Sequence, residues 1–406
     1  MPKLIELEKL GQSVWFDFIR RSLITSGELQ ALIDKGVRGI TSNPAIFEKA
    51  IAGSNDYDEA IKKVIQTEKS IDEIYESLAI EDISMAADLL RSIYESTNGK
   101  DGYVSLEVNP HLADDTENTI AEARRLFETL NRPNVMIKVP ATAAGIPAIT
   151  ALIGDGVNVN VTLIFGLENY KAVADAYLAG LEKLLASGPS VKGGHPVNRV
   201  ASVASFFVSR VDSAVDQALA EANAKELQGK IAIANSKVAY AEFKKIFSGP
   251  RWEELENKGA RAQRVLWAST SAKNPDYPDT IYVDELIGPR TVNTLPPATV
   301  DSFIDHGKAA ETLTLGVDEA QRQIEKLKTL GIDLNAITQK LQDDGVIAFA
   351  QPFDALMQSL ADKRDRLAQH GAGGIARGAE RSLYRECGVI YRECGVTLTM
   401  CGGHNA

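Results

Sequence analysis

The stretch NVMIKVPAT, residues 134–142, places one lysine inside a run that otherwise has the pattern of a buried β-strand. Apolar residues at 135, 137 and 139 alternate with those of the other face, which include Lys138, and this period of two is typical of a strand. Pro140 then ends the run. Lysine is rarely buried unless it is paired or has a chemical task. The stretch therefore predicts a core strand and makes Lys138 a candidate functional residue.

Similar β-branched runs recur along the chain and alternate with helical stretches. Besides 134–140, we expect strands at 13–18, 37–43, 102–108, 157–165, 199–208, 264–270 and 291–295. Amphipathic patterns predict helices between them, for example at 115–130 and 168–186. Eight strands that alternate with helices predict a (β/α)8 TIM barrel, an α/β fold. Residues 44–99 show no strand pattern and are expected to be inserted helices, and a helical region is expected from the last strand to about residue 370.

We expect residues 1–370 to form one barrel domain, because barrels with insertions often reach this length. In residues 371–406 the composition changes: GAGGIARGA is rich in glycine and YRECGV occurs twice. Cys387, Cys394 and Cys401, the three cysteines of the chain, lie here without the short spacing of zinc knuckles. The composition favours a flexible or appended tail over a metal, redox or dinucleotide site.

Composition and charge limit the class of protein. The 406 residues are 44% hydrophobic and carry a formal charge of −11, which argues against a general affinity for nucleic acid or anionic membranes. The N-terminal sequence MPKLIELEKL lacks the apolar region of a secretory signal. No apolar run approaches the roughly 20 residues of a membrane helix. We therefore expect a soluble, cytoplasmic protein.

Polar side chains gather at the C-terminal ends of the expected strands. If each apolar strand face meets the helices, the opposite face points into the barrel, and active sites of such barrels lie at this end. The residues from the first six strands that meet this description are Asp17, Thr41, Asn43, Glu107, Lys138, Asn160, Thr162, Ser205 and Phe207.

Each of these residues also has a structural explanation when taken alone. An Asp at a strand end commonly caps a turn, a Lys commonly lies at a solvated edge, and Asn43 before Pro44 is typical of a turn. Convergence of six strands on one place makes the combination difficult to explain in this way. The set contains no histidine and no spacing of metal ligands, so we expect no metal.

An amine surrounded by carboxylates suits carbonyl chemistry. A free lysine has a pKa of about 10.4 and is protonated at neutral pH, but burial lowers the pKa and yields a nucleophile. The amine can form a Schiff base with a ketone, and the protonated nitrogen then draws electrons from the adjacent C–C bond. Proton transfers at the departing hydroxyl and at the carbinolamine need acids and bases, and Asp17 and Glu107 could divide these tasks.

The segments SVWFDF, GITSNPAIF, YVSLEVNPHLA, MIKVPATAAGIPAI, VNVTLIF and SVASFFVSRVD occur in this order and resemble the transaldolases of the longer bacterial type. The resemblance is collinear over roughly residues 10–370. It implies an enzyme without a cofactor that acts in the pentose phosphate pathway. It also implies transfer of a dihydroxyacetone unit from sedoheptulose 7-phosphate or fructose 6-phosphate to an aldose phosphate. Two alternatives remain: a fructose 6-phosphate aldolase-like enzyme that releases free dihydroxyacetone, and a catalytically silent barrel that acts as a scaffold.

The resemblance also implies a role for individual residues. It implies Lys138 as the Schiff-base lysine and Asp17 as the acid/base for C–C cleavage. It implies that Glu107 works through a water that Thr162 helps to hold. The implied substrate-binding residues are Asn43 and Asn160 for hydroxyl groups, Ser205 and Arg210 for phosphate, and Phe207 beside the lysine.

The phosphate site departs from the family pattern at one position. Many transaldolases carry a second arginine after the seventh strand, where WASTSAKNP provides Lys273 instead. A lysine binds phosphate as a point charge, without the two-pronged geometry of a guanidinium, so the geometry at this position stays open. Glu107 and Phe207 favour transfer over release, because the small aldolases of the superfamily carry Gln and Tyr there. The sequence leaves the oligomeric state and the preferred sugars open.

Overall fold

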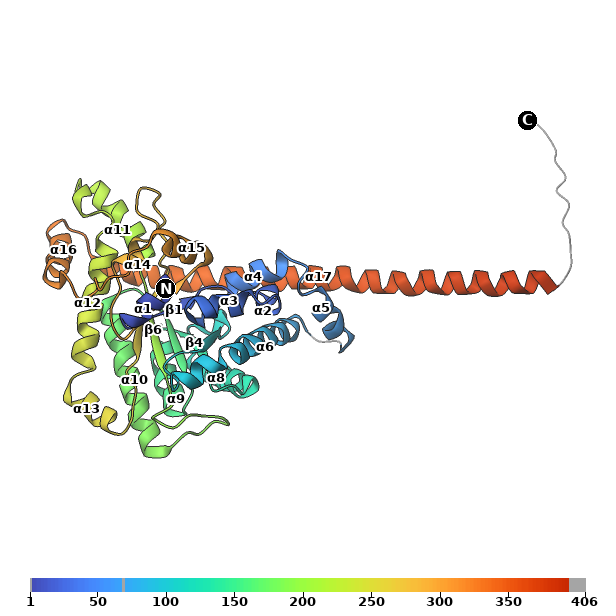
Figure 1. The fold of residues 1–406 in the computed structure, drawn as a ribbon, viewed down its shortest axis with the longest axis horizontal. Coiled ribbons are helices and arrows are strands. Elements are labelled where there is room, and N and C mark those ends of the chain that lie inside the picture. Colours follow the sequence, from blue (N-terminus) through green and yellow to red (C-terminus); the bar gives the residue numbers. More distant parts are fainter. Residues whose placement is uncertain (1, 68–69, 394–406) are drawn as a thin grey trace.

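The computed structural model describes residues 2–67 and 70–393, with the backbone alone from residue 369 onward. Its centre is a closed barrel of parallel strands in sequential order, in which the last strand pairs with the first (Figure 1). All the expected strands are present, and the predicted (β/α)8 barrel is confirmed. The strands are β1 Gln12–Phe16, β2 Val37–Ile40, β3 Tyr103–Glu107, β4 Val135–Pro140, β5 Val159–Ile164, β6 Ser202–Phe207, β7 Arg264–Ala268 and β8 Thr291–Leu295.

Helices surround the barrel and cover its outer face (Figure 1). No helix in the described part of the chain has an apolar stretch long enough to cross a membrane. Short 3₁₀ turns lie at η1 Ile65–Thr67, η2 Pro110–Leu112 and η3 Lys225–Leu227. The α-helices are α1 Lys3–Lys9, α2 Arg21–Thr25, α3 Glu28–Lys35, α4 Pro44–Ala52, α5 Asp58–Val64, α6 Ile71–Leu89, α7 Arg91–Ser96, α8 Thr116–Leu130, α9 Gly145–Gly154, α10 Leu167–Ser187, α11 Ser209–Glu221, α12 Ile231–Ile246, α13 Pro250–Asn257, α14 Ile281–Asp284, α15 Pro297–His306, α16 Val317–Thr329 and α17 Leu334–Glu393.

The two helices expected from amphipathic patterns, α8 and α10, are confirmed. In α8 the carboxylate of Asp115 accepts a hydrogen bond from the backbone N–H of Asn118 at 3.0 Å, which satisfies a free donor of the first turn. Asn131 ends the helix in the left-handed conformation, with φ of 44°. Short polar signals therefore set both ends of a helix whose buried face packs on the barrel.

The insertion between β2 and β3 is helical, as predicted, and comprises α4 to α7. The buried carboxylate of Asp82 on α6 accepts hydrogen bonds from the hydroxyl of Tyr57, at 2.7 Å, and from Nε of Arg21, at 2.8 Å. Arg21 lies on α2, directly after the first strand. The insertion is thus fixed to the barrel by a buried polar network and lies beside the C-terminal ends of the strands.

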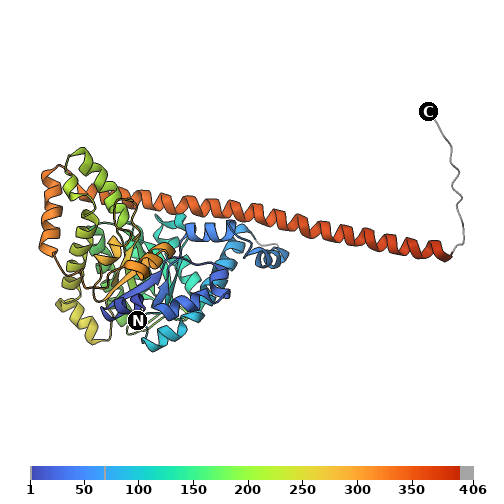
Figure 2. The ribbon, with the colours of Figure 1, turned by 45° about the horizontal axis from the view of Figure 1, so that its top comes forward.

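The helix α17 crosses the C-terminal end of the barrel and continues past it (Figure 2). The Gln342 side chain donates to the carbonyl oxygens of Ala141 and Leu163, both at 2.9 Å, at the ends of β4 and β5. Further along, Lys363 forms an ion pair with Asp58 at 2.8 Å. The expected domain boundary at residue 371 falls within α17. Because residues 394–406 lie outside the described residues, the division into barrel and tail stays a prediction.

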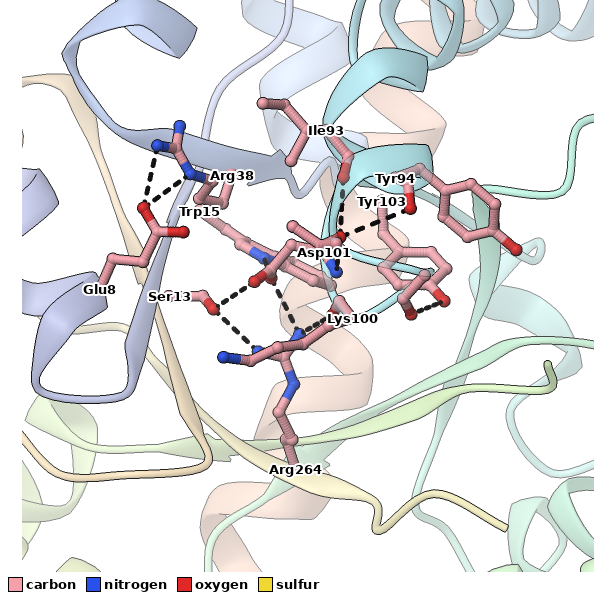
Figure 3. A network of polar contacts seen from close by, with 12 residues as sticks. Glu8, Ser13, Trp15, Arg38, Ile93, Tyr94, Lys100, Asp101, Tyr103 and Arg264 are labelled. Carbon is pink, nitrogen blue, oxygen red and sulfur yellow. Dashed lines mark hydrogen bonds and ion pairs between the residues drawn. The ribbon is translucent and has the colours of Figure 1, made fainter. Parts of the chain in front are cut away.

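A buried polar network closes the N-terminal end of the barrel, opposite α17 (Figure 3). The carboxylate of Asp101, which is 1% exposed, accepts hydrogen bonds from Ser13 at 2.7 Å and from Nε1 of Trp15 at 3.2 Å. It also forms an ion pair with Arg264 at 3.0 Å. The network joins β1, β7 and the segment before β3, and so supports the closure of the barrel.

We expect Asp101→Ala to lower the free energy of unfolding by about 3–5 kcal/mol, because it leaves the Arg264 guanidinium buried without its counter-charge. Urea denaturation measures this loss. The control is Asp88→Ala, which breaks an ion pair with Arg132 whose two side chains are 58% and 32% exposed. Such a pair contributes at most about 1 kcal/mol. Equal losses in the two variants would contradict the importance of the buried network.

Candidate active site

The side chain of Lys138 lies at the C-terminal end of the barrel, on β4, and is 7% exposed. Its Nζ donates to the carboxylate of Glu107 at 3.2 Å and to the carbonyl oxygen of Ser42 at 3.3 Å. An ammonium group has three N–H donors, so one is left for a ligand. Lys138 lines a cavity of about 500 Å³. The nitrogen is therefore held on one side and accessible on the other.

An aromatic ring from the C-terminal helix covers this nitrogen. Nζ of Lys138 lies 5.2 Å from the ring centroid of Phe349 on α17, within the range of a cation–π contact. Phe349 is 8% exposed and lines the same cavity. Phe349 could not be identified from the sequence, because only the tertiary path of α17 brings it to β4. Lys49 on α4 also lines the cavity and was not identified.

Three consecutive residues after β2 each support a different part of the site. The hydroxyl of Thr41 donates to Asp17 at 2.6 Å, and the carbonyl oxygen of Ser42 accepts from Lys138. The Asn43 side chain accepts from the backbone N–H of Ile46 at 3.0 Å and caps α4, whose first residue is Pro44. The segment TSNP thus combines helix-capping signals with contacts to both candidate catalytic groups.

The carboxyl groups of Asp17 and Glu107 have shifted proton affinities. Burial raises the pKa of Asp17, against the hydrogen bond from Thr41 and the positive charges of Lys138 and Lys273. Burial likewise raises the pKa of Glu107, against the charge and hydrogen bond of Lys138. A raised pKa brings the protonated and ionised forms closer in energy at neutral pH. Such groups suit general acid–base catalysis.

The polar residues of β5 and β6 lie at different depths. The hydroxyl of Thr162 lines the cavity, is buried, and has no hydrogen-bond partner in the described part of the chain. Asn160 is fully buried and does not line the cavity. Its amide nitrogen donates to Ser105 at 3.0 Å, and its oxygen accepts from Ser205 at 2.7 Å. Among these residues Thr162 and Ser205 reach the cavity, and Asn160 lies behind Ser205.

The far wall of the cavity is cationic and aromatic. Phe207 packs against Phe165, with ring centroids 5.0 Å apart, and the guanidinium of Arg210 lies 5.5 Å from the Phe207 centroid. Lys273 donates to the hydroxyl of Ser271 at 2.6 Å. Burial and then the charge of Arg210 lower the pKa of Lys273, and burial lowers the pKa of Arg210. Two cations that repel each other at one cavity suit an anionic group such as phosphate.

Comparisons with known proteins agree with this arrangement. The family model described as transaldolase/fructose-6-phosphate aldolase matches residues 14–360. Transaldolase 2 of Nostoc punctiforme is 48% identical over 375 residues, which cover 89% of this chain and 97% of the relative. The transaldolase of Trichodesmium erythraeum is 47% identical over 378 residues, which cover 90% of this chain and 98% of the relative. The transaldolase of Neisseria meningitidis is also 47% identical, over 361 residues, which cover 89% of this chain and 100% of the relative. The chain therefore belongs to the transaldolase/fructose-6-phosphate aldolase family.

Proposed function

We propose that this family member is a transaldolase in which Lys138 forms a Schiff base with the ketose phosphate. The observation that carries the proposal is the environment of Lys138: a buried amine on β4 that pairs with Glu107, lies close to the ring of Phe349 and lines a cavity. Relatives that cover most of this chain are named transaldolases. The retained lysine, carboxylates and cations argue against a catalytically silent scaffold.

In the proposed reaction, Lys138 first passes a proton to Glu107, which lies 3.2 Å away, and the neutral amine attacks the C2 carbonyl of the ketose. The carbinolamine loses water to give a protonated imine. Asp17 then takes the proton of the C4 hydroxyl, the C3–C4 bond breaks, and its electrons move onto the imine to form an enamine. The fragment that begins at C4 becomes an aldehyde and leaves as the first product, an aldose phosphate. An acceptor aldehyde takes the enamine carbon as Asp17 returns the proton. Hydrolysis of the new imine regenerates Lys138.

The position of the Thr162 hydroxyl supports the proposal that Glu107 acts through a bound water molecule. Water must leave when the imine forms and return when it is hydrolysed. The Thr162 hydroxyl is buried at the cavity without a partner in the described residues, and a water bound there would satisfy it. We propose that Thr162 holds this water while Glu107 carries its proton.

We propose that the substrate phosphate binds Arg210 and Lys273, with Ser205 and Asn43 along the sugar chain. All four line the cavity, whose volume of about 500 Å³ suits a sugar phosphate. Asn160 acts in this scheme through Ser205, whose hydroxyl it holds. The proposed donors are sedoheptulose 7-phosphate and fructose 6-phosphate. We also propose a cytoplasmic location, and the acidic net charge argues against partners such as nucleic acid or anionic membranes.

The test compares fructose 6-phosphate alone with fructose 6-phosphate plus erythrose 4-phosphate. We expect rapid formation of glyceraldehyde 3-phosphate and sedoheptulose 7-phosphate when both sugars are present. Free dihydroxyacetone should form much more slowly when the acceptor is absent. Release of dihydroxyacetone at the rate of transfer would support the aldolase alternative instead.

Phe349→Ala is expected to raise the ratio of dihydroxyacetone release to transfer by roughly tenfold, which corresponds to about 1.4 kcal/mol between the two barriers. The ring shields the nitrogen of the enamine from water, and its loss lets hydrolysis compete with the acceptor. Coupled assays on one preparation measure both rates.

The matched control for this variant is Phe353→Ala, one helical turn further along α17. Phe353 is similarly buried, but its ring packs on Tyr75, with centroids 5.5 Å apart. It should lower stability and leave the ratio unchanged. If Phe353→Ala changes the ratio as much as Phe349→Ala does, the effect comes from the position of the helix and not from the ring over Lys138.

We further propose that residues 1–370 form the catalytic domain and that the rest of the chain is an appendage. Deleting 377–406 is expected to leave transfer activity and melting temperature nearly unchanged, because it removes none of the described contacts of Lys363. Deletion from residue 361 also removes Lys363 and should destabilise the protein. A loss above about 2 kcal/mol in the shorter deletion would mean that the tail docks on the barrel.

A further inference from the structure

A second cavity, of about 350 Å³, lies at the N-terminal end of the barrel. Its wall contains Tyr103 at the start of β3, Met136 on β4 and Val203 on β6, together with the segments that precede β3, β7 and β8. It shares no lining residue with the cavity at Lys138, which lies at the other end of the strands. A ligand in it would therefore not compete for the active site.

Positive charges dominate the polar part of this lining. The cations are Lys100, Arg261, Arg264 and Arg290. Arg264 is neutralised by Asp101, as Figure 3 shows. Among the side chains that the structure describes, in residues 2–67 and 70–368, no carboxylate forms an ion pair with Lys100, Arg261 or Arg290. The cavity thus concentrates unpaired positive charge in a chain whose formal charge is −11, which gives it a strong local attraction for anions.

Neutral groups hold the two unpaired guanidinium groups in place. Arg261 donates to the carbonyl oxygens of Asn98 and Gly99, both at 2.7 Å. Gly99 has φ of +75°, and a Cβ there would lie 2.8 Å from the Arg261 guanidinium, so the loop needs glycine at this place. Arg290 lies 5.2 Å over the ring of Phe243. Carbonyls and a ring fix these cations while most of their N–H donors stay available.

The backbone at Arg290 is also unusual. Its φ of 59° lies in the left-handed region, which a non-glycine residue adopts at a cost in energy. Such strain tends to occur at ligand sites. Most of the remaining surface of the lining is apolar, although the polar residues Thr97, Asn98 and Ser202 also contribute to it. A mostly apolar concavity with a few fixed charged groups is the usual composition of a small-molecule site.

We propose that this cavity binds a small phosphomonoester, with the phosphate on Arg261 and Arg290 and the body against the accessible part of the lining, which includes Thr97 and Ala262. Guanidinium groups offer paired N–H donors that match phosphate oxygens. The site is separate from the proposed phosphate site at Arg210. Its occupant would bind without blocking sugar transfer.

The experiment counts binding sites for inorganic phosphate by equilibrium dialysis on the full chain. We expect the wild type to bind one equivalent at each end of the barrel. The double variant Arg261→Gln, Arg290→Gln should lose one equivalent and keep its transfer activity, whereas Arg210→Ala should lose the other. Arg290→Gln alone, at an exposed residue, should weaken the first equivalent by about ten- to a hundredfold, as expected for loss of a charged hydrogen bond.

Arg322→Gln is the charge-matched control, since Arg322 pairs with Glu319 on α16, away from both cavities. It should keep both equivalents. Loss of all binding in Arg210→Ala, or two equivalents in the double variant, would overturn the proposal. Phenyl phosphate should bind the N-terminal site more tightly than inorganic phosphate, because its ring adds apolar contact with the accessible part of the lining. Equal affinities would contradict the assignment to a phosphomonoester.

Discussion

Lys138→Ala is expected to lower the rate of transfer by about 10⁴-fold or more while leaving the fold intact, on the scale of nucleophile removal in other covalent enzymes. No other lysine can replace it, because it is the amine held between Glu107 and Ser42 on β4. Lys49 and Lys273 line the cavity but come from a helix and a loop at its edge. The measurement is sedoheptulose 7-phosphate formation under saturating substrates.

The control for this variant is Lys237→Ala. Lys237 is 9% exposed and donates to the carbonyl oxygen of Leu315 at 3.1 Å, so it is a buried lysine outside the active-site cavity. Its removal should cost stability and leave the turnover of folded protein unchanged. Substantial transfer activity in folded Lys138→Ala would show that covalent catalysis does not pass through this residue.

Asp17→Asn is expected to slow C–C cleavage by about 10²–10⁴-fold, the usual contribution of a general acid–base group. Thr41 donates to the Asp17 carboxylate at 2.6 Å, and the charge of Lys138 also acts on it, so the carboxylate is held within the electrostatic influence of the lysine that we propose forms the Schiff base. An amide in its place cannot take the hydroxyl proton. Imine formation should continue, and single-turnover kinetics should show accumulation of the donor adduct.

Glu107→Gln provides the comparison for Asp17→Asn. Glu107 accepts a hydrogen bond from Nζ of Lys138, and we propose that it carries the proton transfers at this nitrogen. This variant should slow imine formation and hydrolysis, so little adduct accumulates. If both variants lose adduct to the same extent, the proposed division of tasks between the two carboxylates is wrong.

The strand pattern of the sequence was sufficient to predict the barrel and to place the candidate catalytic residues at the ends of its strands. In 134–140 the alternation of β-branched residues with those of the other face placed Lys138 on the inner face, because side chains of a strand alternate strictly between faces. The same rule placed Asp17 and Glu107 at the same end. Local alternation therefore predicts which residues point inward without any information about residues that are distant in the sequence.

Depth inside the barrel could not be predicted from alternation alone. Inner-face residues of a barrel form layers, so two polar residues of one strand differ in depth. Thr162 reaches the cavity, whereas Asn160, two positions earlier, is held between Ser105 and Ser205. The contact between Phe349 and Lys138 could not be predicted for a different reason, because it depends on how α17 packs across the barrel.

Borohydride trapping is the most direct test of whether Lys138 forms a Schiff base with the sugar phosphate. The protein is incubated with fructose 6-phosphate, reduced with borohydride, digested and analysed by mass spectrometry. We expect a reduced three-carbon adduct on the peptide that contains Lys138, and we expect it only when the sugar phosphate is present. An adduct on another lysine, or none at all in a preparation that catalyses transfer, would contradict it.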